Sequence, residues 1–132
     1  VDCAMKNLSL GMIKHPARWH GDRMRQTLPS ICALREIERK HKLTVVNALK
    51  IVVDGGPTVL QENIKEEDRI LIGTDMVAID SLGGRLIDQE RGRRGLKDLA
   101  EDNRPPTYLN AARDMKMGQP ELDRVDLIEI PM

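Results

Sequence analysis

The stretch from Arg69 to Ile87, RILIGTDMVAIDSLGGRLI, limits the fold more than any other part of the chain. Its uninterrupted apolar run, residues 70–72, is typical of a strand covered on both faces, as in parallel sheets flanked by helices. Gly73 and Thr74 end this strand. Asp75 then stands where its carboxylate can accept hydrogen bonds from the first free amides of a helix. We therefore predict a buried strand that leads directly into a capped helix.

The predicted helix has two different faces. Its apolar stripe recurs at helical spacing, at Ile79, Leu82 and Leu86. The second face carries Asp80, Gly83 and Gly84 and has no bulk. Because each glycine inside a helix costs about 1 kcal/mol relative to alanine, we expect another backbone or a ligand to approach this face closely. Two interpretations stay open: Asp75 is only a cap and Asp80 only anchors a neighbouring loop, or both carboxylates belong to a site.

A second buried strand is predicted from Leu43 to Val53, LTVVNALKIVV, which is rich in β-branched residues. Asn47 interrupts it, and a buried amide must either pin a loop or face a ligand. A sharp turn follows at Asp54, Gly55, Gly56 and Pro57. In open parallel sheets ligands bind beyond the carboxyl ends of the strands, so two parallel neighbours would bring this turn beside Asp75. The connection, residues 59–68, is short for a crossover helix, so another arrangement stays open.

Composition argues against several classes of function. The chain has 21 basic and 21 acidic residues, so it lacks the electrostatic footprint of a nucleic-acid-binding protein. Trp19 and Tyr108 are its only aromatic residues, which argues against base stacking. No apolar run approaches the roughly 20 residues that cross a bilayer, and no signal peptide is recognisable, so we expect a soluble protein. Cys3 and Cys32 are isolated, which favours free thiols in a reducing, cytoplasmic compartment.

The first residues contain further candidates for binding. Lys6 and Asn7 interrupt the apolar pattern of a short helix, and Lys6 is either exposed or a fixed charge for an anionic ligand. The polar loop of residues 14–25, KHPARWHGDRMR, contains His15 and His20. These histidines flank a proline and do not share a helix face, so we expect a solvated loop near an anionic pocket rather than a metal site.

We predict a structural role for the remaining segments. Pro29 suits the first turn of a helix whose apolar stripe would be Ile31, Leu34 and Ile37. Residues 91–104 predict a solvated link. A helix is expected from Thr107 to a C-cap at Gly118, and Tyr108 could reach the cleft from it. The segment 125–130, VDLIEI, predicts a short edge strand.

Several of these motifs together resemble one known family. MKNLSLGM near the start, the strand that leads to GGP, and GTDMVAIDSLGGRLI are similar to the proteins grouped as domain of unknown function DUF362, and the chain resembles the second half of that family. The matching positions are Lys6, Asn7, Gly11, His20, Gly56, Pro57, Thr74, Asp75, Ala78 and Asp80. Family members often carry a ferredoxin-type module, or occur beside iron–sulfur proteins, and their activity is not established. Asn47 departs from an acidic position of the family, and cluster-binding cysteines are missing.

We therefore predict an α/β fold, with a small, mostly parallel sheet and flanking helices in a single layer-type domain over residues 1–132. We expect this domain to be a fragment of a longer family domain. Its predicted function is that of a part of an iron–sulfur-associated redox or accessory protein, which binds a small anionic or metal-bearing ligand beyond the strand ends. The ligand-binding candidates are Lys6, Asn7, His20, Gly55, Gly56, Pro57, Thr74, Asp75 and Asp80.

Catalysis stays open in this interpretation. As an enzyme, the protein would use Lys6 and His20 for charge stabilisation or proton transfer, and Asp75 or Asp80 as a carboxylate partner or metal ligand. The alternative is a noncatalytic assembly module that docks onto another subunit. We expect no cofactor in this chain, and an iron–sulfur cluster only on a partner or on a missing segment. The expected partners are a second copy or an iron–sulfur protein, with neither nucleic acid nor membrane.

Overall fold

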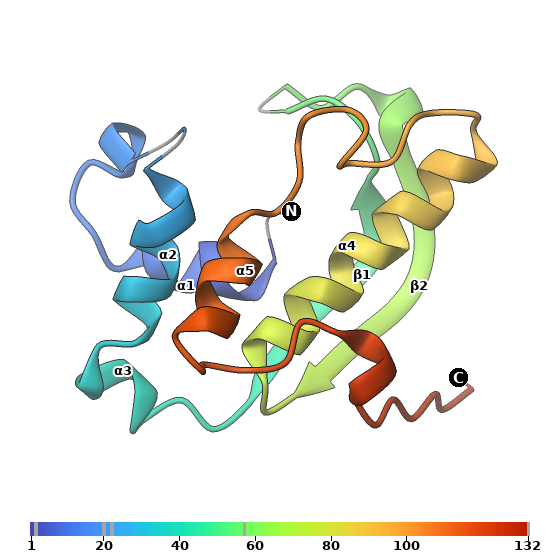
Figure 1. Ribbon diagram of the computed structural model, residues 1–132. Coiled ribbons are helices and arrows are strands. Elements are labelled where there is room, and N and C mark those ends of the chain that lie inside the picture. The colour runs from blue at the N-terminus through green and yellow to red at the C-terminus, as the bar shows by residue number, and fades with distance from the viewer. Residues whose placement is uncertain (2, 20, 22, 57, 132) are drawn as a thin grey trace.

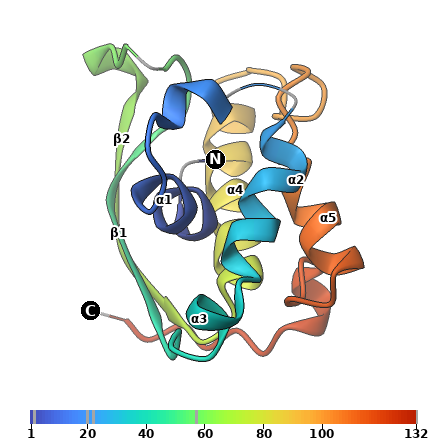
Figure 2. The ribbon, with the colours of Figure 1, turned by 90° about the vertical axis from the view of Figure 1, so that its left-hand side faces the viewer.

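The helices of the protein lie on one side of a small twisted sheet (Figure 1, Figure 2). The computed structural model describes residues 1, 3–19, 21, 23–56 and 58–131. In chain order, the elements are α1 (Ala4–Gly11), η1 (Pro16–Trp19), α2 (Met24–Cys32), α3 (Arg35–Glu38), β1 (Thr44–Val52), η2 (Gln61–Asn63), β2 (Ile64–Gly73), α4 (Met76–Arg93), α5 (Tyr108–Asp114) and η3 (Leu122–Arg124). None of the helices in the described ranges is both long and apolar enough to cross a bilayer.

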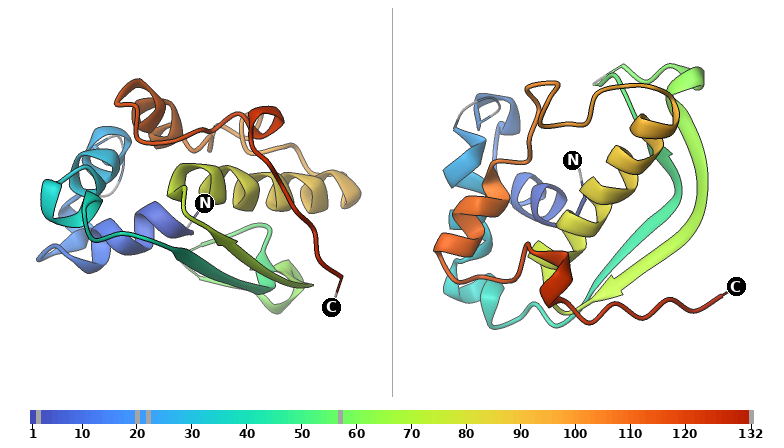
Figure 3. Two further views of the ribbon diagram at one scale, coloured as in Figure 1. Left: turned by 90° about the horizontal axis from the view of Figure 1, so that it is seen from below. Right: turned by 45° about the vertical axis from the view of Figure 1, so that its right-hand side comes forward.

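The sheet of the described residues has two strands, β1 and β2, and they are antiparallel. Thr44 pairs with Gly73 at one end, and Val52 pairs with Ile64 at the other. The predicted mostly parallel sheet is therefore wrong. Residues 53–63 only turn the chain round, because they are too few for the crossover that two parallel strands require. The two strands form a long, bent hairpin (Figure 3).

The hairpin has one buried face and one open face. On the inner face, Ala48 and Leu71 are buried against Ile79 and Leu86 of α4. Ile70 and Ile72 instead point away from the helices and are 51% and 62% exposed. The prediction of a strand covered on both faces is thus wrong for β2. The uninterrupted apolar run resembles a central strand, but here only every second side chain reaches the core.

The start of α4 agrees with the sequence prediction. Oδ1 of Asp75 accepts hydrogen bonds from the amides of Val77 and Ala78, at 2.8 and 3.0 Å, so Asp75 is the N-cap. Its other oxygen, Oδ2, accepts the amide of Gln119 at 2.8 Å. A Cβ at Gly118 would overlap this carboxylate. Asp75 therefore starts α4 and also holds the segment that follows α5 against it.

The glycine face of α4 is covered by the chain's own first residues. A Cβ at Gly83 would lie 3.3 Å from Sγ of Cys3, and one at Gly84 would lie 3.5 Å from Val1. The expected close approach is therefore present, but it is made by the side chains of Cys3 and Val1 rather than by another backbone or a ligand. The small residues allow this segment to pass between α4 and β1.

The helices remote from the sheet differ in their bounds from the sequence prediction. Pro29 lies late in α2 rather than in a first turn, and the helix ends at Cys32 before the separate short α3. The predicted stripe is consequently broken: Ile37 is buried, whereas Leu34 is half exposed. Helix α5 runs from Tyr108 to Asp114, so it begins one residue after the predicted Thr107 and ends before the predicted C-cap at Gly118. Tyr108 is buried in the core rather than in a cleft.

The last residues do not form the predicted strand. Residues 125–131 have no regular secondary structure, and η3 precedes them. An ion pair of 3.3 Å joins Glu129 to Arg69 of β2. This segment therefore runs past the hairpin without a ladder of backbone hydrogen bonds (Figure 3).

Replacing the N-cap tests this account of α4. We expect Asp75→Ala to lower the free energy of unfolding by about 1–2 kcal/mol, as the loss of an N-cap does, measured by urea denaturation. Asp75→Asn keeps an accepting oxygen and should recover most of this loss. The control Asp114→Ala, at the exposed end of α5, should stay within about 0.5 kcal/mol of the wild type. An equal effect of the two alanine variants would contradict the capping role.

Candidate functional site

The structure separates the two strand ends that were expected to form one site. Because β1 and β2 are antiparallel, Gly55 and Gly56 follow one end of the hairpin, and Thr74 and Asp75 follow the other. The expected convergence of these two loops is wrong. His20 and Pro57 lie outside the described residues. The remaining candidates divide between two cavities, the N-cap of α4 and the core.

The larger cavity, of about 670 Å³, lies between β1, the first residues of the chain and the glycine face of α4. Three of the predicted residues line it: Lys6, Gly55 and Gly56. The two glycines have φ values of +85° and +103°, which a residue with a Cβ rarely adopts. They turn the chain sharply at the end of β1.

The lining of this cavity is mostly apolar, with a few charged groups near its rim. Its apolar side chains are Val1, Val46, Ile51, Leu71, Leu86 and Leu99. Three basic residues from separate segments also line it: Lys6 of α1, Lys50 of β1 and Arg104 of the loop before α5. Asp54 is the acidic residue in the lining. Such a combination suits a small ligand with an apolar body and an anionic group.

A second cavity, of about 480 Å³, lies beside the start of β1. Asn7 lines it, and Nδ2 of Asn7 donates to the carbonyl of Cys3 at 2.7 Å. Asn47 lines both cavities, and its Oδ1 accepts the amide of Leu49 at 3.0 Å. Asn47 is exposed, so the expectation of a buried amide is wrong. Its side chain stabilises an irregular part of β1, where the pairing register shifts between Ala48 and Lys50.

Asp80 lies in the core and is fully buried. Its carboxylate accepts hydrogen bonds from the amides of Ala4 and Met5 at the start of α1, the second at 3.1 Å, and from the hydroxyl of Tyr108 at 3.1 Å. Burial raises the pKa of Asp80, and the hydrogen bonds from Ala4, Met5, Tyr108 and Cys3 counteract this in part. Asp80 therefore anchors α1 and α5 to α4, which is the structural role that the sequence left open.

The two cysteines are buried thiols on either side of this carboxylate. Both are free, as predicted. Burial, with a contribution from the charge of Asp80, raises the pKa of Cys3 to about 12 and that of Cys32 to about 11. Within the described ranges, no group of three or more His, Cys, Asp or Glu side chains could hold a metal ion. The described residues thus do not fit an iron–sulfur cluster.

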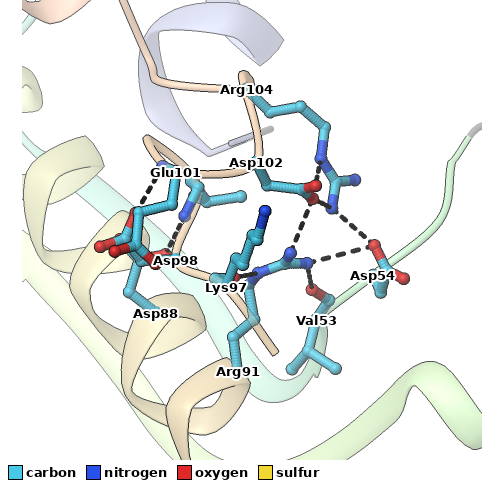
Figure 4. Close-up of polar contacts among 10 residues, drawn as sticks. Val53, Asp54, Asp88, Arg91, Lys97, Asp98, Glu101, Asp102 and Arg104 are labelled. Carbon is cyan, nitrogen blue, oxygen red and sulfur yellow. Dashed lines mark hydrogen bonds and ion pairs between the residues drawn. The ribbon is translucent and has the colours of Figure 1, made fainter. Parts of the chain in front are cut away.

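A cluster of charges closes the far end of the larger cavity (Figure 4). Arg91 is only 2% exposed, and its guanidinium donates to the carbonyls of Val53 and Lys97 and to the carboxylates of Asp54 and Asp102. Arg104 bonds the same two carboxylates from the solvent side. The prediction of a solvated link is therefore wrong for Arg91. Its partners are 6 to 38 residues away in the chain, beyond the spacing of neighbours on one helix face, so no local pattern indicated them.

This cluster perturbs the titration of Asp54. The hydrogen bond from Arg104, with those from the amide of Gly55 and from Arg91, lowers the pKa of Asp54 to about 2. The Arg104 and Arg91 contacts also lower the pKa of Asp102. Both carboxylates are therefore charged at neutral pH, and they form ion pairs with the guanidinium groups of Arg91 and Arg104 at this end of the cavity.

Comparison with known proteins identifies one family. The model of the family described as Domain of unknown function (DUF362) matches residues 1–85, which comprise α1 to the first half of α4. This match does not support a correspondence to the second half of that family. No curated protein and no solved structure shows significant similarity to the chain.

Removing the buried carboxylate should destabilise the whole fold. Asp80→Ala leaves two amides and one hydroxyl without their acceptor, and each buried unpaired group costs about 1–3 kcal/mol. We expect the free energy of unfolding to fall by at least about 3 kcal/mol in chemical denaturation. Tyr108→Phe removes a single donor and should cost about 1 kcal/mol. A loss below 1 kcal/mol for Asp80→Ala would show that Asp80 does not anchor the helices.

The lowered pKa of Asp54 predicts a particular pH dependence. Its stabilising contribution is present above its usual pKa of 3.8 and is lost as the pH falls through about 2, because protonation removes its contacts with Arg104 and Arg91. The difference in unfolding free energy between the wild type and Asp54→Asn should be constant above about pH 5 and shrink toward pH 2. Urea denaturation at several pH values measures it. Asp126→Asn, in the exposed last segment, should match the wild type throughout.

Proposed function

The chain belongs to the DUF362 family, and we propose that it is a ligand-binding component of an iron–sulfur-associated redox or accessory protein. The observation that carries this proposal is the cavity of about 670 Å³, whose lining is mostly apolar and includes two lysines from separate segments, Lys6 of α1 and Lys50 of β1. Ligand sites for small molecules usually have volumes of about 300–1,000 Å³ and a few polar groups that orient the ligand.

The ligand that fits this lining is small, partly apolar and anionic. Lys6 and Lys50 provide positive charge on opposite walls, and Lys50 has only an exposed ion pair of 3.4 Å with Glu66 to exchange for a ligand. Exposed ion pairs of this kind are worth little, so an anion can replace Glu66 at small cost. Gly56, where an added Cβ would meet no atom within 4 Å, leaves room for its approach to the backbone after β1.

An iron–sulfur cluster has no place among the described residues of this chain. The buried, protonated thiols of Cys3 and Cys32 support the proposal that any cluster belongs to a partner or to another segment. The metal-bearing ligand is the less favoured form of the proposal, because the cavity presents basic and apolar groups rather than a set of metal ligands. The described geometry supports binding and does not by itself support a reaction.

A second candidate function is that of a noncatalytic assembly module. The open face of the hairpin favours it, because Val45 and Ile72 form a cross-strand pair in which both side chains are more than half exposed. Exposed apolar patches on soluble proteins often mark contact surfaces. The two functions use different faces of β1 and are therefore compatible.

Titration with phenyl phosphate, followed by NMR of the backbone amides, tests the ligand proposal. This probe combines an apolar ring with an anionic group, and phenol serves as its uncharged counterpart. We expect phenyl phosphate to shift the amides of Gly55, Gly56 and Gly83, which line the cavity, more than the amide of Gly118 at the far end of the sheet. Phenol should bind at least threefold more weakly, because it lacks the charge that the lysines attract.

Charge variants complete this test. Lys6→Met and Lys50→Met should each weaken phenyl phosphate binding about threefold to tenfold, whereas Lys40→Met, which removes an exposed charge outside the cavity, should leave it unchanged. Equal effects of all three variants would show that phenyl phosphate binds only through general attraction between an anion and a basic surface. The absence of shifts at Gly55 and Gly83 would exclude the cavity as the site.

A further inference from the structure

The two arginines at the far end of the larger cavity bond the same two carboxylates. Asp54 accepts a hydrogen bond from Nη1 of Arg91 at 3.1 Å and another from Nη2 of Arg104 at 2.6 Å. Asp102 accepts from Nη2 of Arg91 at 2.7 Å and from Nε of Arg104 at 2.9 Å. Each carboxylate therefore has a guanidinium partner on either side (Figure 4). If one arginine left this cluster, both carboxylates would still have the other.

Arg91 is the fixed member of the pair. Its side chain is buried, and it also donates to two backbone carbonyls, those of Val53 and Lys97. A buried guanidinium that lost these acceptors would be an unpaired charge away from water, which is strongly unfavourable. Arg91 therefore stays in place and keeps its contacts with both carboxylates.

Arg104 is the movable member. Its side chain is 40% exposed, and within the described ranges its guanidinium bonds Asp54 and Asp102 alone. Exposed ion pairs contribute little to stability, because water and other ions compete for both partners. The backbone of Arg104 is held separately, since its amide donates to the carbonyl of Leu99 at 2.7 Å. The side chain can therefore turn away from the carboxylates while the loop keeps its shape.

We propose that Arg104 leaves the two carboxylates when a ligand enters the larger cavity, and that it then binds the anionic group of this ligand. Arg104 already lines the cavity, so it does not have to be brought in from elsewhere. This inference rests on the first proposed function and narrows its ligand. A guanidinium donates two parallel N–H bonds, which match two oxygens of a phosphate or a carboxylate. The anionic group is therefore an oxyanion of this kind.

The exchange distinguishes an anionic ligand from an uncharged one. Without a ligand, Asp54 and Asp102 are charged at neutral pH, because the contacts with Arg104 lower the pKa of both carboxyl groups. They therefore hold Arg104 until another anion competes for it. A ligand without an anionic group offers Arg104 nothing in exchange and meets only the apolar walls. An oxyanion gains a cation beyond the two lysines.

Asp102→Asn tests the exchange, with phenyl phosphate titrated against the backbone amides of Gly55 and Gly83. Asp102 does not belong to the lining of the cavity, whereas its partner Arg104 does. We expect this variant to bind phenyl phosphate about threefold to tenfold more tightly, because a neutral amide holds a guanidinium less firmly than a carboxylate does. A folding defect would weaken binding rather than tighten it. Unchanged or weaker binding would overturn the proposal.

Removal of the arginine shows whether this gain passes through Arg104. Arg104→Met should weaken the binding of phenyl phosphate about threefold to tenfold, and in the double variant with Asp102→Asn the gain should disappear. A gain that persists without Arg104 would mean that Asp102 acts by its charge alone, and the proposal would fall. The matched controls are Arg113→Met and Glu121→Gln, because Arg113 likewise bonds two carboxylates, those of Asp114 and Glu121, but lies outside the cavity. Both controls should leave the Kd unchanged.

Arg104→Lys separates the shape of the guanidinium from its charge. A lysine keeps the positive charge but lacks the two parallel donors. We expect this variant to bind phenyl phosphate at least about threefold more weakly than the wild type. Binding as tight as that of the wild type would overturn the two-point contact with an oxyanion.

The side-chain Nε–H signal of Arg104 in the NMR spectrum, identified by its loss in Arg104→Met, reports the exchange directly. We expect phenyl phosphate to shift this signal and to leave that of Arg113 unchanged. If the amides of Gly55 and Gly83 shift while the Arg104 signal does not, the exchange is overturned and the ligand-binding function stands. If neither these amides nor the Arg104 signal shifts, the ligand-binding function fails, and the exchange fails with it.

Discussion

The buried carboxylate of Asp80 joins three helices at one point, and the arrangement of the remaining elements depends on it. It stands on α4 and accepts the first amides of α1 and the hydroxyl of Tyr108 on α5. It also lies between the two apolar clusters of the core, one around Met5 and Tyr108 and the other around Ile79 and the sheet. A buried carboxyl group needs hydrogen-bond partners for its oxygens, and the amides of Ala4 and Met5 provide two of them, so Asp80 fixes the position of the start of α1.

That position determines the candidate site. With α1 held by Asp80, the residues before it lie across Gly83 and Gly84 and form one wall of the larger cavity, while Lys6 reaches its lining from the first turn of α1. At the other end, Arg91 ties the end of β1 to the loop that precedes α5. Two charged or polar side chains of α4, Asp80 and Arg91, thus hold the segments that form the walls of the cavity. Apolar packing fills the space between these two anchors.

The parts of the fold that depend on neighbouring residues could be predicted from the sequence. Three features follow from residues within a few positions of each other: the N-cap at Asp75, the apolar stripe of Ile79 and Leu86, and the turn at Gly55 and Gly56. The direction of β2 could not be predicted in this way, because an apolar run such as ILI is equally compatible with a strand covered on two faces or on one. The length of the connection favoured a hairpin, and this was the more informative signal.

The candidate site was predictable in part. Lys6, Gly55 and Gly56 do line one cavity, whereas Asp75 lies at the opposite end of the hairpin and Asp80 inside the core. Whether a carboxylate lines the cavity, caps a helix or lies in the core depends on its hydrogen-bond partners. Those partners are distant in the sequence: Gln119 for Asp75, and Ala4 and Tyr108 for Asp80. The same reason explains why Arg91 was taken for a solvated residue.

The anchoring of α1 by Asp80 has a consequence during translation. Helix α1 leaves the ribosome before α4, because the carboxylate that fixes its start is synthesised 76 residues after Ala4. An isolated helix of eight residues is marginal in water, so α1 and its apolar side chains stay without a docking surface until α4 has emerged. The hairpin and α4 are contiguous in the chain and can associate as soon as they are made. Until α4 has emerged, α1 is therefore exposed to chaperones and proteases.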